Sequence, residues 1–144
     1  MRKELLTDMI YEADEEKVKS FLVESDDEEL YVFAYNYNWE NGFDIPTIII
    51  NNSCCSLSTA LLVFYRADGY SFLMDKEADG DLLPWHTFIS DVYSRIISGC
   101  YKQSDIAFVP PLTKVQIFKL EKQINKSEQI FITAVEGKNC DIEI

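Results

Sequence analysis

The sequence predicts an all-α fold: a single helical domain over residues 1–144, built as an array of about six to eight short helices that pack as antiparallel pairs. Three observations support this prediction. Apolar residues recur at helical spacing in most segments, and turn-forming residues interrupt them at short intervals. The chain also holds only 5 Gly and 4 Pro among 144 residues, of which 47% are hydrophobic, so it can bury a sizeable core with little long coil.

Two short helices are expected at the N-terminus. Over residues 3–12, Leu5 and Met9 recur at helical spacing, each with an apolar residue immediately after it. Asp14 is expected to begin the second helix, because its carboxylate can accept hydrogen bonds from free backbone N–H groups. Val18, Phe21 and Leu22 would form the buried face of that helix.

A third helix is expected to run into an aromatic corner at residues 35–46, with the sequence YNYNWENGFDIP. The Asn41-Gly42 pair tolerates positive φ and therefore predicts a helix stop. Asp44, which precedes Ile45-Pro46, predicts the start of the next helix. The helix leading into the corner carries the clearest amphipathic stripe of the chain, formed by Leu30, Phe33, Ala34 and Tyr37.

The central helices follow the corner. Propensity alone would favour a strand for the isoleucine-rich segment 47–52, but the Asp and Pro in front of it favour a short helix. Ser56 is expected to cap a helix over residues 57–67 that has almost no polar face and therefore belongs in the middle of a core. Asp68-Gly69 would end that helix, and Pro84 would begin the longest helix of the chain.

The C-terminal third gives weaker signals. Apolar residues over 112–124 predict a further helix with a lysine-rich outer face. Residues 130–135 are ambiguous between strand and helix, and the alternation in residues 140–144 suggests a short strand near the C-terminus. The lysines expected on the outer face of the helix are Lys114, Lys119, Lys122 and Lys126.

The charge of the chain is uneven. The net charge is −12, and residues 1–81 carry all of it, with 18 acidic against 6 basic residues, whereas residues 82–144 have 7 of each. Such a field disfavours nucleic acid and anionic membranes but permits a basic protein partner, whose approach it would steer. The alternative is that the acidity only keeps the protein in solution. With no apolar stretch long enough to span a bilayer and an N-terminus that turns acidic early, a cytoplasmic location is expected.

The search for catalytic chemistry finds little. The four cysteines include no CxxC pair, and we interpret them as small buried hydrophobic residues of a reduced protein. The single histidine, His86, is expected to be a helix-start residue with a satisfied ring. No nucleophile motif and no glycine-rich phosphate loop is present in the sequence. We therefore expect neither enzymatic activity nor a cofactor.

One segment, DKEADGDL at residues 75–82, resembles a helix–loop–helix calcium loop, with oxygen ligands at alternate positions around a glycine. Its twelfth position holds His86 where a bidentate glutamate is required, so much of the coordination is missing. The segment is better explained as a solvated acidic turn, and no metal site is predicted.

Two motifs resemble those of a known family. The pattern YNWxxGFxxP at residues 37–46, together with TALxxFxxADG near residues 59–69, resembles the bacterial domain of unknown function numbered 4274, over about residues 28–100. The resemblance implies a small helical domain. It implies no activity, no cofactor and no catalytic residue.

The leading hypothesis is a non-enzymatic, acidic protein-binding domain. In its more specific form, which rests on analogy of size and charge, the domain is an immunity protein that neutralises a basic bacterial toxin domain. The alternative is a small ligand-binding protein or enzyme with a pocket beside the corner at residues 35–46, where the candidates would be His86, Glu40, Asn38 and the Cys54-Cys55 pair. The residues expected to contact a protein partner are Trp39, Glu40, Asn41, Glu28, Glu29, Asp75, Glu77 and Asp79.

Overall fold

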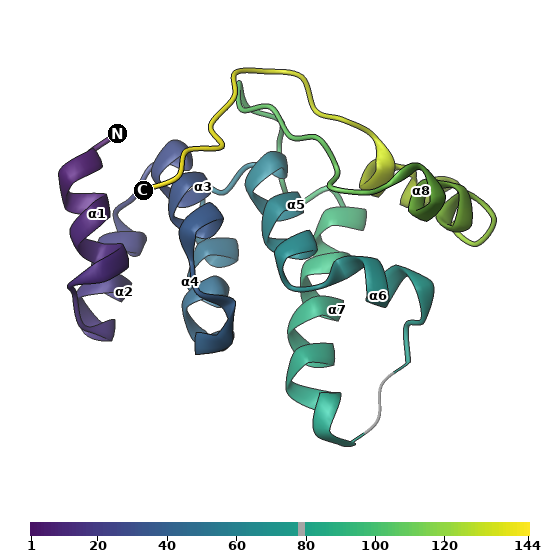
Figure 1. Ribbon diagram of the computed structural model, residues 1–144, viewed down its shortest axis with the longest axis horizontal. Helices are drawn as coiled ribbons and strands as arrows, with labels where there is room; N and C mark the ends of the chain where they lie inside the picture. The colour runs from purple at the N-terminus through teal and green to yellow at the C-terminus, as the bar shows by residue number, and fades with distance from the viewer. Residues whose placement is uncertain (78–79) are drawn as a thin grey trace.

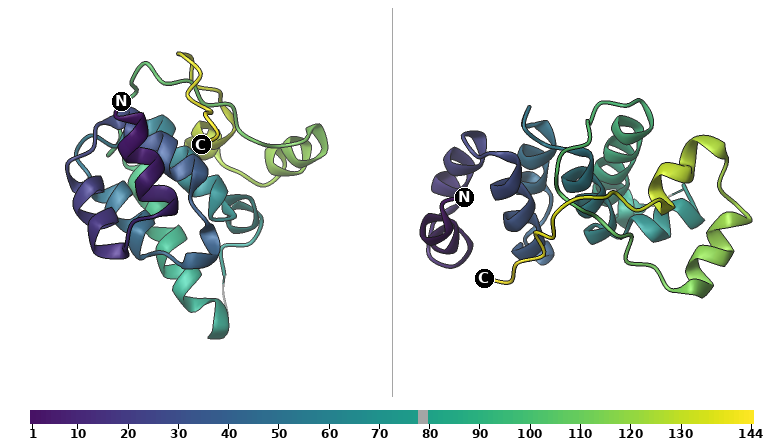
Figure 2. Two further views of the ribbon diagram at one scale, coloured as in Figure 1. Left: turned by 60° about the vertical axis from the view of Figure 1, so that its left-hand side comes forward. Right: turned by 90° about the horizontal axis from the view of Figure 1, so that it is seen from above.

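The computed structural model describes residues 1–77 and 80–144 and confirms an all-α fold of packed helices (Figure 1). Helices α1, α3 and α5 form one row, and α2, α4 and α7 lie against them, so α1–α2, α3–α4 and α5–α7 stack as successive pairs (Figures 1 and 2). The elements are α1 (Lys3–Tyr11), α2 (Glu15–Val23), α3 (Asp27–Asn36), η1 (Trp39–Asn41), α4 (Asp44–Asn51), α5 (Leu57–Arg66), α6 (Gly69–Met74), η2 (Gly80–Leu82), α7 (Leu83–Ile97), α8 (Lys114–Glu121) and η3 (Lys126–Ile132).

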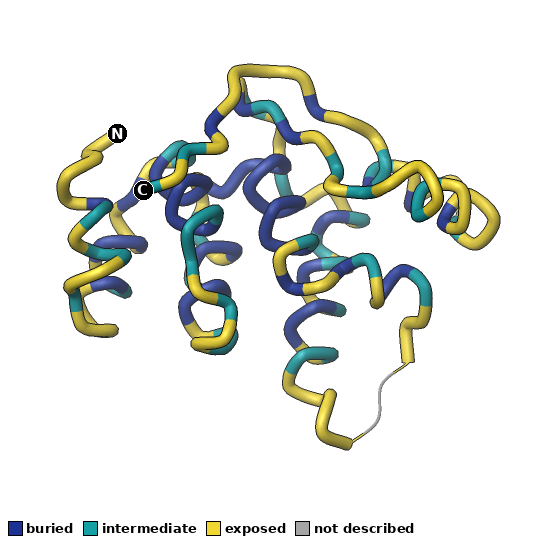
Figure 3. The backbone as a smooth tube through the Cα atoms, viewed as in Figure 1, coloured by how far each residue is buried: buried dark blue, intermediate teal, exposed yellow. Residues whose placement is uncertain are grey.

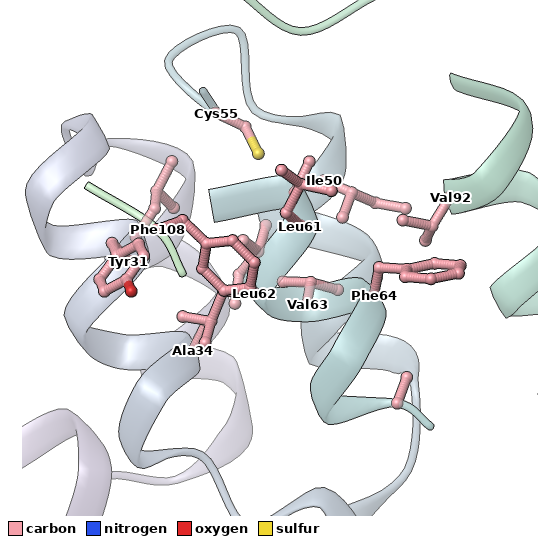
Figure 4. Packing of buried hydrophobic residues seen from close by; sticks show 14 of the residues in the cluster. Tyr31, Ala34, Ile50, Cys55, Leu61, Leu62, Val63, Phe64, Val92 and Phe108 are labelled. Carbon is pink, nitrogen blue, oxygen red and sulfur yellow. The ribbon is translucent and has the colours of Figure 1, made fainter. Parts of the chain in front are cut away.

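Helix α5 is the centre of the core, as its largely apolar sequence predicts. Its N-terminus is capped by the Ser56 side chain, and every residue from Leu57 to Phe64 is buried. Side chains of α5 lie between Tyr31 of α3 on one side and Val92 of α7 on the other (Figure 4). A helix in this position is largely apolar because it has neighbours rather than solvent around it, and its buried polar residues Ser58 and Thr59 are hydrogen-bonded to Ile106 and Asp27.

The corner is built differently from the sequence prediction. Helix α3 ends at Asn36, before the Asn41-Gly42 pair; that pair instead ends the short 3₁₀ helix η1, with Gly42 at its C-cap. Gly42 does adopt a positive φ of +91°. Helix α4 begins at Asp44 itself, with Phe43 at the N-cap and no side-chain cap, whereas Asp44 was expected to supply the cap. The isoleucine-rich segment is helical, as predicted.

A left-handed residue makes the turn from α5 to α6. Asp68 has φ +64° and ψ +46°, and its carboxylate accepts a hydrogen bond from the backbone N–H of Ser71. The following Gly69 lies directly against the ring of Phe64, where a Cβ atom would overlap the ring. The Asp-Gly pair is therefore required here by both conformation and packing.

The C-terminal segment returns over the helical array. Isolated β-bridges join Ile106 to Lys138 and Phe108 to Val135, but residues 140–144 form no strand. The strand expected there is replaced by an extended segment that crosses the upper end of the array toward the N-terminus (Figure 1). Asn36 holds it: its side-chain amide donates to the Ile142 carbonyl over 2.7 Å, and its side-chain oxygen accepts from the backbone N–H of Ile144 over 2.9 Å.

Two expectations about burial were wrong. The apolar residues of α8 were expected to face the body, but Val115 and Phe118 are exposed because α8 projects away from the array (Figure 3). Of the four cysteines, Cys55 and Cys140 are buried, whereas Cys54 and Cys100 lie exposed in turns that follow α4 and α7. Among the described residues, no helix combines the length and apolarity needed to cross a bilayer.

We predict that Leu61→Ala lowers the free energy of unfolding by about 3 kcal/mol, because it leaves a cavity in the fully buried centre of α5. Urea denaturation monitored by circular dichroism measures the change. Leu83→Ala, which truncates an exposed leucine, is the matched control and should change it by less than about 0.5 kcal/mol. Equal effects of the two substitutions would contradict the central placement of α5.

Candidate functional site

The aromatic corner lies on one edge of the array, where the turn between α1 and α2 and the start of α7 also lie (Figure 1). These turns carry many exposed carboxylates and bring acidic residues that are far apart in the sequence to one edge. Asp68, after α5, joins them across a groove described below. We call this surface the acidic edge; it comprises Glu12, Asp14, Glu15, Glu16, Glu40, Asp44, Asp68 and Asp81. Basic side chains among them include Lys17, Lys19 and Arg66, and Lys19 pairs with Glu15 over 3.5 Å and with Glu16 over 3.7 Å.

Local hydrogen bonds fix the conformation of the corner. The Asn38 side chain accepts from the backbone N–H of Glu40 over 3.1 Å and so caps the 3₁₀ turn. The Tyr37 hydroxyl donates to the Gly42 carbonyl over 2.9 Å, which closes the loop. The Tyr37 ring packs edge to face against the Trp39 ring, with the ring centroids 5.2 Å apart. Burial raises the pKa of Tyr37 to about 12, so its hydroxyl remains a proton donor at neutral pH.

An aromatic groove lies on one side of Trp39, with a volume of about 430 Å³. The Phe43 and Phe88 rings stack with their centroids 4.9 Å apart. The Trp85 indole N–H donates a hydrogen bond to the Ala67 carbonyl over 2.6 Å. Contacts inside the protein therefore fix both walls of the groove. The lining residues are Trp39, Phe43, Arg66, Ala67, Asp68, Ser71, Leu82 and Trp85. The two motifs that carry the family resemblance therefore meet in space: one supplies Trp39 and Phe43, the other Ala67 and Asp68.

Trp39, which lines this groove, has a buried indole N–H group. This group is inaccessible to solvent and has no hydrogen-bond partner within residues 1–77 and 80–144. An unpaired buried donor costs about 1–3 kcal/mol, so this arrangement is unfavourable for the free protein. Any rearrangement of the corner that gave this N–H an acceptor would regain part of that cost.

A second hollow, of about 630 Å³, lies on the other side of the corner, between it and the turn from α1 to α2. Tyr37, Asn38 and Asn41 line it from the corner, and Met9, Ala13 and Val18 line it from the first helix pair. The segment Trp39-Glu40-Asn41 is thus a ridge between two hollows. These are three of the residues that the sequence predicted for partner contact.

The structure does not bring the other predicted contact residues to this ridge. Glu28 and Glu29 lie at the first turn of α3, and the corner follows its last turn, so about 13 Å of helix separates them. Glu28 pairs with Lys138 over 3.1 Å. Asp75 and Glu77 are exposed beyond the end of α6, and Asp79 lies outside the described residues.

Glu29 is unsuited to contact a partner, because only 2% of its surface is exposed. Its carboxylate accepts from the Arg2 side chain over 2.8 and 3.0 Å and from the Arg2 backbone N–H over 3.1 Å. It also completes the capping box of α3 with Asp26. These hydrogen bonds, chiefly those from the Arg2 side chain, lower the pKa of Glu29 from 4.5 to about 2. Its role is to tie the N-terminus to α3.

The candidate catalytic side chains are dispersed. His86 lies near the start of α7, with its Nε2 atom 2.7 Å from the Lys76 carbonyl, which satisfies the ring as predicted. Cys54 and Cys55 lie in the turn between α4 and α5, away from the corner that precedes α4. Burial raises the pKa of the Cys55 thiol, which disfavours the reactive thiolate. Within residues 1–77 and 80–144, no group of three or more His, Cys, Asp or Glu side chains could hold a metal ion.

Among the residues that line the groove, only Trp39 was predicted from the sequence as a contact residue. Arg66, Leu82 and Trp85 have no periodicity or motif that marks them as site residues, because turns that only the fold brings together place them there. Asp68 did carry a signal: the Asp-Gly pair ends α5, and the αL conformation that such a pair tolerates often occurs at functional turns.

A family model described as Domain of unknown function (DUF4274) matches residues 25–97. The chain belongs to this family. The matched residues begin just before α3 and end with the last residue of α7, so the DUF4274 part contains the corner and the aromatic groove, whereas α1, α2 and α8 lie outside it. Comparisons with curated proteins and with solved structures gave no match.

We predict that Glu29→Gln lowers the free energy of unfolding at pH 7 by about 2 kcal/mol, because it removes charged hydrogen bonds to Arg2. Since the folded-state pKa is depressed, this stabilisation is fully present above pH 4.5 and is lost as the pH falls toward about 2. Urea denaturation between pH 7 and pH 2 should show the two proteins converging at the acid end. Glu136→Gln, at an exposed position, is the control; a constant gap for Glu29→Gln at all pH values would contradict the assignment.

Proposed function

We propose that this protein is a non-enzymatic protein-binding domain whose acidic edge binds a basic protein, with the corner ridge at its centre. The observation that carries the proposal is the coincidence of three features at one edge: the carboxylates, the apolar groove and a partly exposed Trp39 between two hollows. Binding hot spots typically combine an aromatic anchor, a pocket beside it and a charged rim.

The contacts around the groove support binding without large rearrangement. Trp85 is held by the Ala67 carbonyl, Phe43 by Phe88, and the corner by Tyr37 and Asn38, so little conformational entropy remains to be lost on association. The charge of the rim has a separate effect. Carboxylates on one edge steer a basic partner and raise the association rate more than they lengthen the lifetime of the complex.

In its more specific form, the proposal is that the partner is a basic bacterial toxin domain and that this chain is its immunity protein, acting in the cytoplasm. Acidic domains of this size can neutralise a toxin by covering its active site, and no catalytic group of their own is required. Co-expression with the product of the adjacent gene tests this form: protection from growth arrest supports it, and growth arrest despite co-expression counts against it.

We predict that neutralising Glu12, Glu15 and Glu40 together slows association with the basic partner about tenfold at low salt and weakens the salt dependence of the rate. The partner is first recovered from the native host at low ionic strength, and association rates are then measured by stopped flow. The dissociation rate should change much less, because rim charges act mainly on encounter.

The matched control neutralises Glu121, Glu136 and Glu143, which are also exposed but lie off the acidic edge. Both triple variants change the net charge of −12 by the same three units. Slower association in the edge variant alone supports the proposal. Equal slowing in both would show that only net charge matters, and failure to recover any partner at low salt would contradict the proposal as a whole.

A second candidate function is supported by the hollow between the corner and the first helix pair, whose volume of about 630 Å³ is in the range of small-molecule sites. In this proposal a small ligand lies against Tyr37 and Asn41. Native mass spectrometry of protein isolated gently from its host should then show a bound small molecule. Ala13→Trp, which fills the hollow, should abolish it, whereas Ala134→Trp at an exposed position should not. Protein without added mass would contradict this candidate.

A further inference from the structure

The two ends of the array carry complementary surfaces that no contact within the described structure uses. At one end is a groove lined mainly by residues of α1 and α2, the first helix pair. At the other end, α8 projects from the body with one face uncovered (Figures 1 and 3). Both elements lie outside the segment matched by the family model.

The groove at the N-terminal end, which we call the end groove, has a volume of about 460 Å³. Leu5, Met9 and Phe21 form its apolar floor, and acidic side chains gather beside them. In stacked helical arrays each pair covers its neighbour, and a terminal pair needs a polar outer face to remain uncovered. In the end groove an apolar floor interrupts such a polar face, whose lining residues are Arg2, Asp14, Glu16, Lys17, Ser20 and Glu24.

The two cations in the end groove leave its acidic character in place. Arg2 is paired with Glu29 and also lies over the Phe21 ring at 4.9 Å, so its charge is largely compensated. Lys17 remains exposed among the carboxylates of Asp14, Glu16 and Glu24, and outside the lining Lys19 approaches Glu16 to 3.7 Å. Three carboxylates still exceed these two lysines. The end groove is therefore an apolar trough with a net acidic rim.

The exposed face of α8 has the opposite pattern. Val115, Phe118, Lys119 and Lys122 stand at i, i+3, i+4 and i+7, so they share one face of the helix. Val115 and Phe118 are 62% and 58% exposed. The Lys122 ammonium lies 4.2 Å from the centre of the Phe118 ring and keeps positive charge beside the apolar stripe. Lys114 and Lys126 add further positive charge near the two ends of the helix.

We propose that the end groove of one copy of this chain receives α8 of another copy, with the apolar stripe on the floor of the groove and the lysines against its acidic rim. The two surfaces lie at opposite ends of the molecule, so each contact leaves one groove and one helix free. The contact is heterologous, and association is head-to-tail and open-ended rather than a closed dimer.

The size of the contact sets its strength. A helix of eight residues is about 12 Å long, which places the contact among small, transient interfaces. A dissociation constant on the order of 100 μM is expected, so assembly appears at high concentration and weakens with salt. This proposal does not depend on the corner ridge or on its partner; Asp14 and Glu16 lie both on the acidic edge and in the end groove.

The test uses two full-length variants, each of which disables one surface at exposed positions. Leu5→Lys with Glu24→Lys disables the end groove, and Phe118→Glu with Lys119→Glu disables α8. In sedimentation velocity between about 20 and 800 μM, the mean mass of the native chain should rise above 16.7 kDa with concentration and fall back in 0.5 M salt. Each variant alone should remain at 16.7 kDa throughout.

An equimolar mixture of the two variants retains one intact groove and one intact helix. It should therefore form a 1:1 dimer and nothing larger, which no symmetric interface would produce. Leu83→Glu, at an exposed position on neither surface, should assemble as the native chain does. A native chain that stays monomeric at 800 μM, variants that still assemble, or a mixture that forms no dimer would each overturn the proposal.

Discussion

The burial of α5 on all sides is the constraint on which the rest of the structure depends. Its eight consecutive buried residues can be covered only if α3, α4, α6 and α7 all pack around one short helix. That requirement fixes the order of the helix pairs. It also places the turn before α4 and the turn after α5 near each other, and so determines where the two family motifs meet.

The functional surface is a consequence of this packing. Trp39 and Phe43 reach the groove because α3 and α4 flank α5, and Asp68 reaches it because α5 ends there in a left-handed turn. Trp85 completes the groove from α7 through its hydrogen bond to Ala67. The groove thus contains residues of η1, α5, α6, η2 and α7 and of the turns before α4 and after α5, so its shape depends on how the core packs.

How far the sequence predicts this protein depends on whether local or distant contacts decide each feature. The helices, the Ser56 and Asp14 caps and the buried α5 follow from periodicity and capping chemistry. Two features depend on residues that are far apart in the sequence: Arg2 covers and pairs with Glu29, and Asn36 holds the extended C-terminal segment. Local sequence patterns do not predict either contact. The corner ridge was predicted from composition, whereas its groove partners were not.

The central claim is that the corner ridge and the aromatic groove form the contact surface for a basic protein. Hydrogen exchange of the free and partner-bound protein, followed by mass spectrometry, tests it most directly. The claim predicts slower exchange on binding at residues 37–44, 66–71 and 80–85, which surround the groove. Slower exchange confined to residues 24–30 and 52–56, at the opposite ends of α3 and α4, would contradict it.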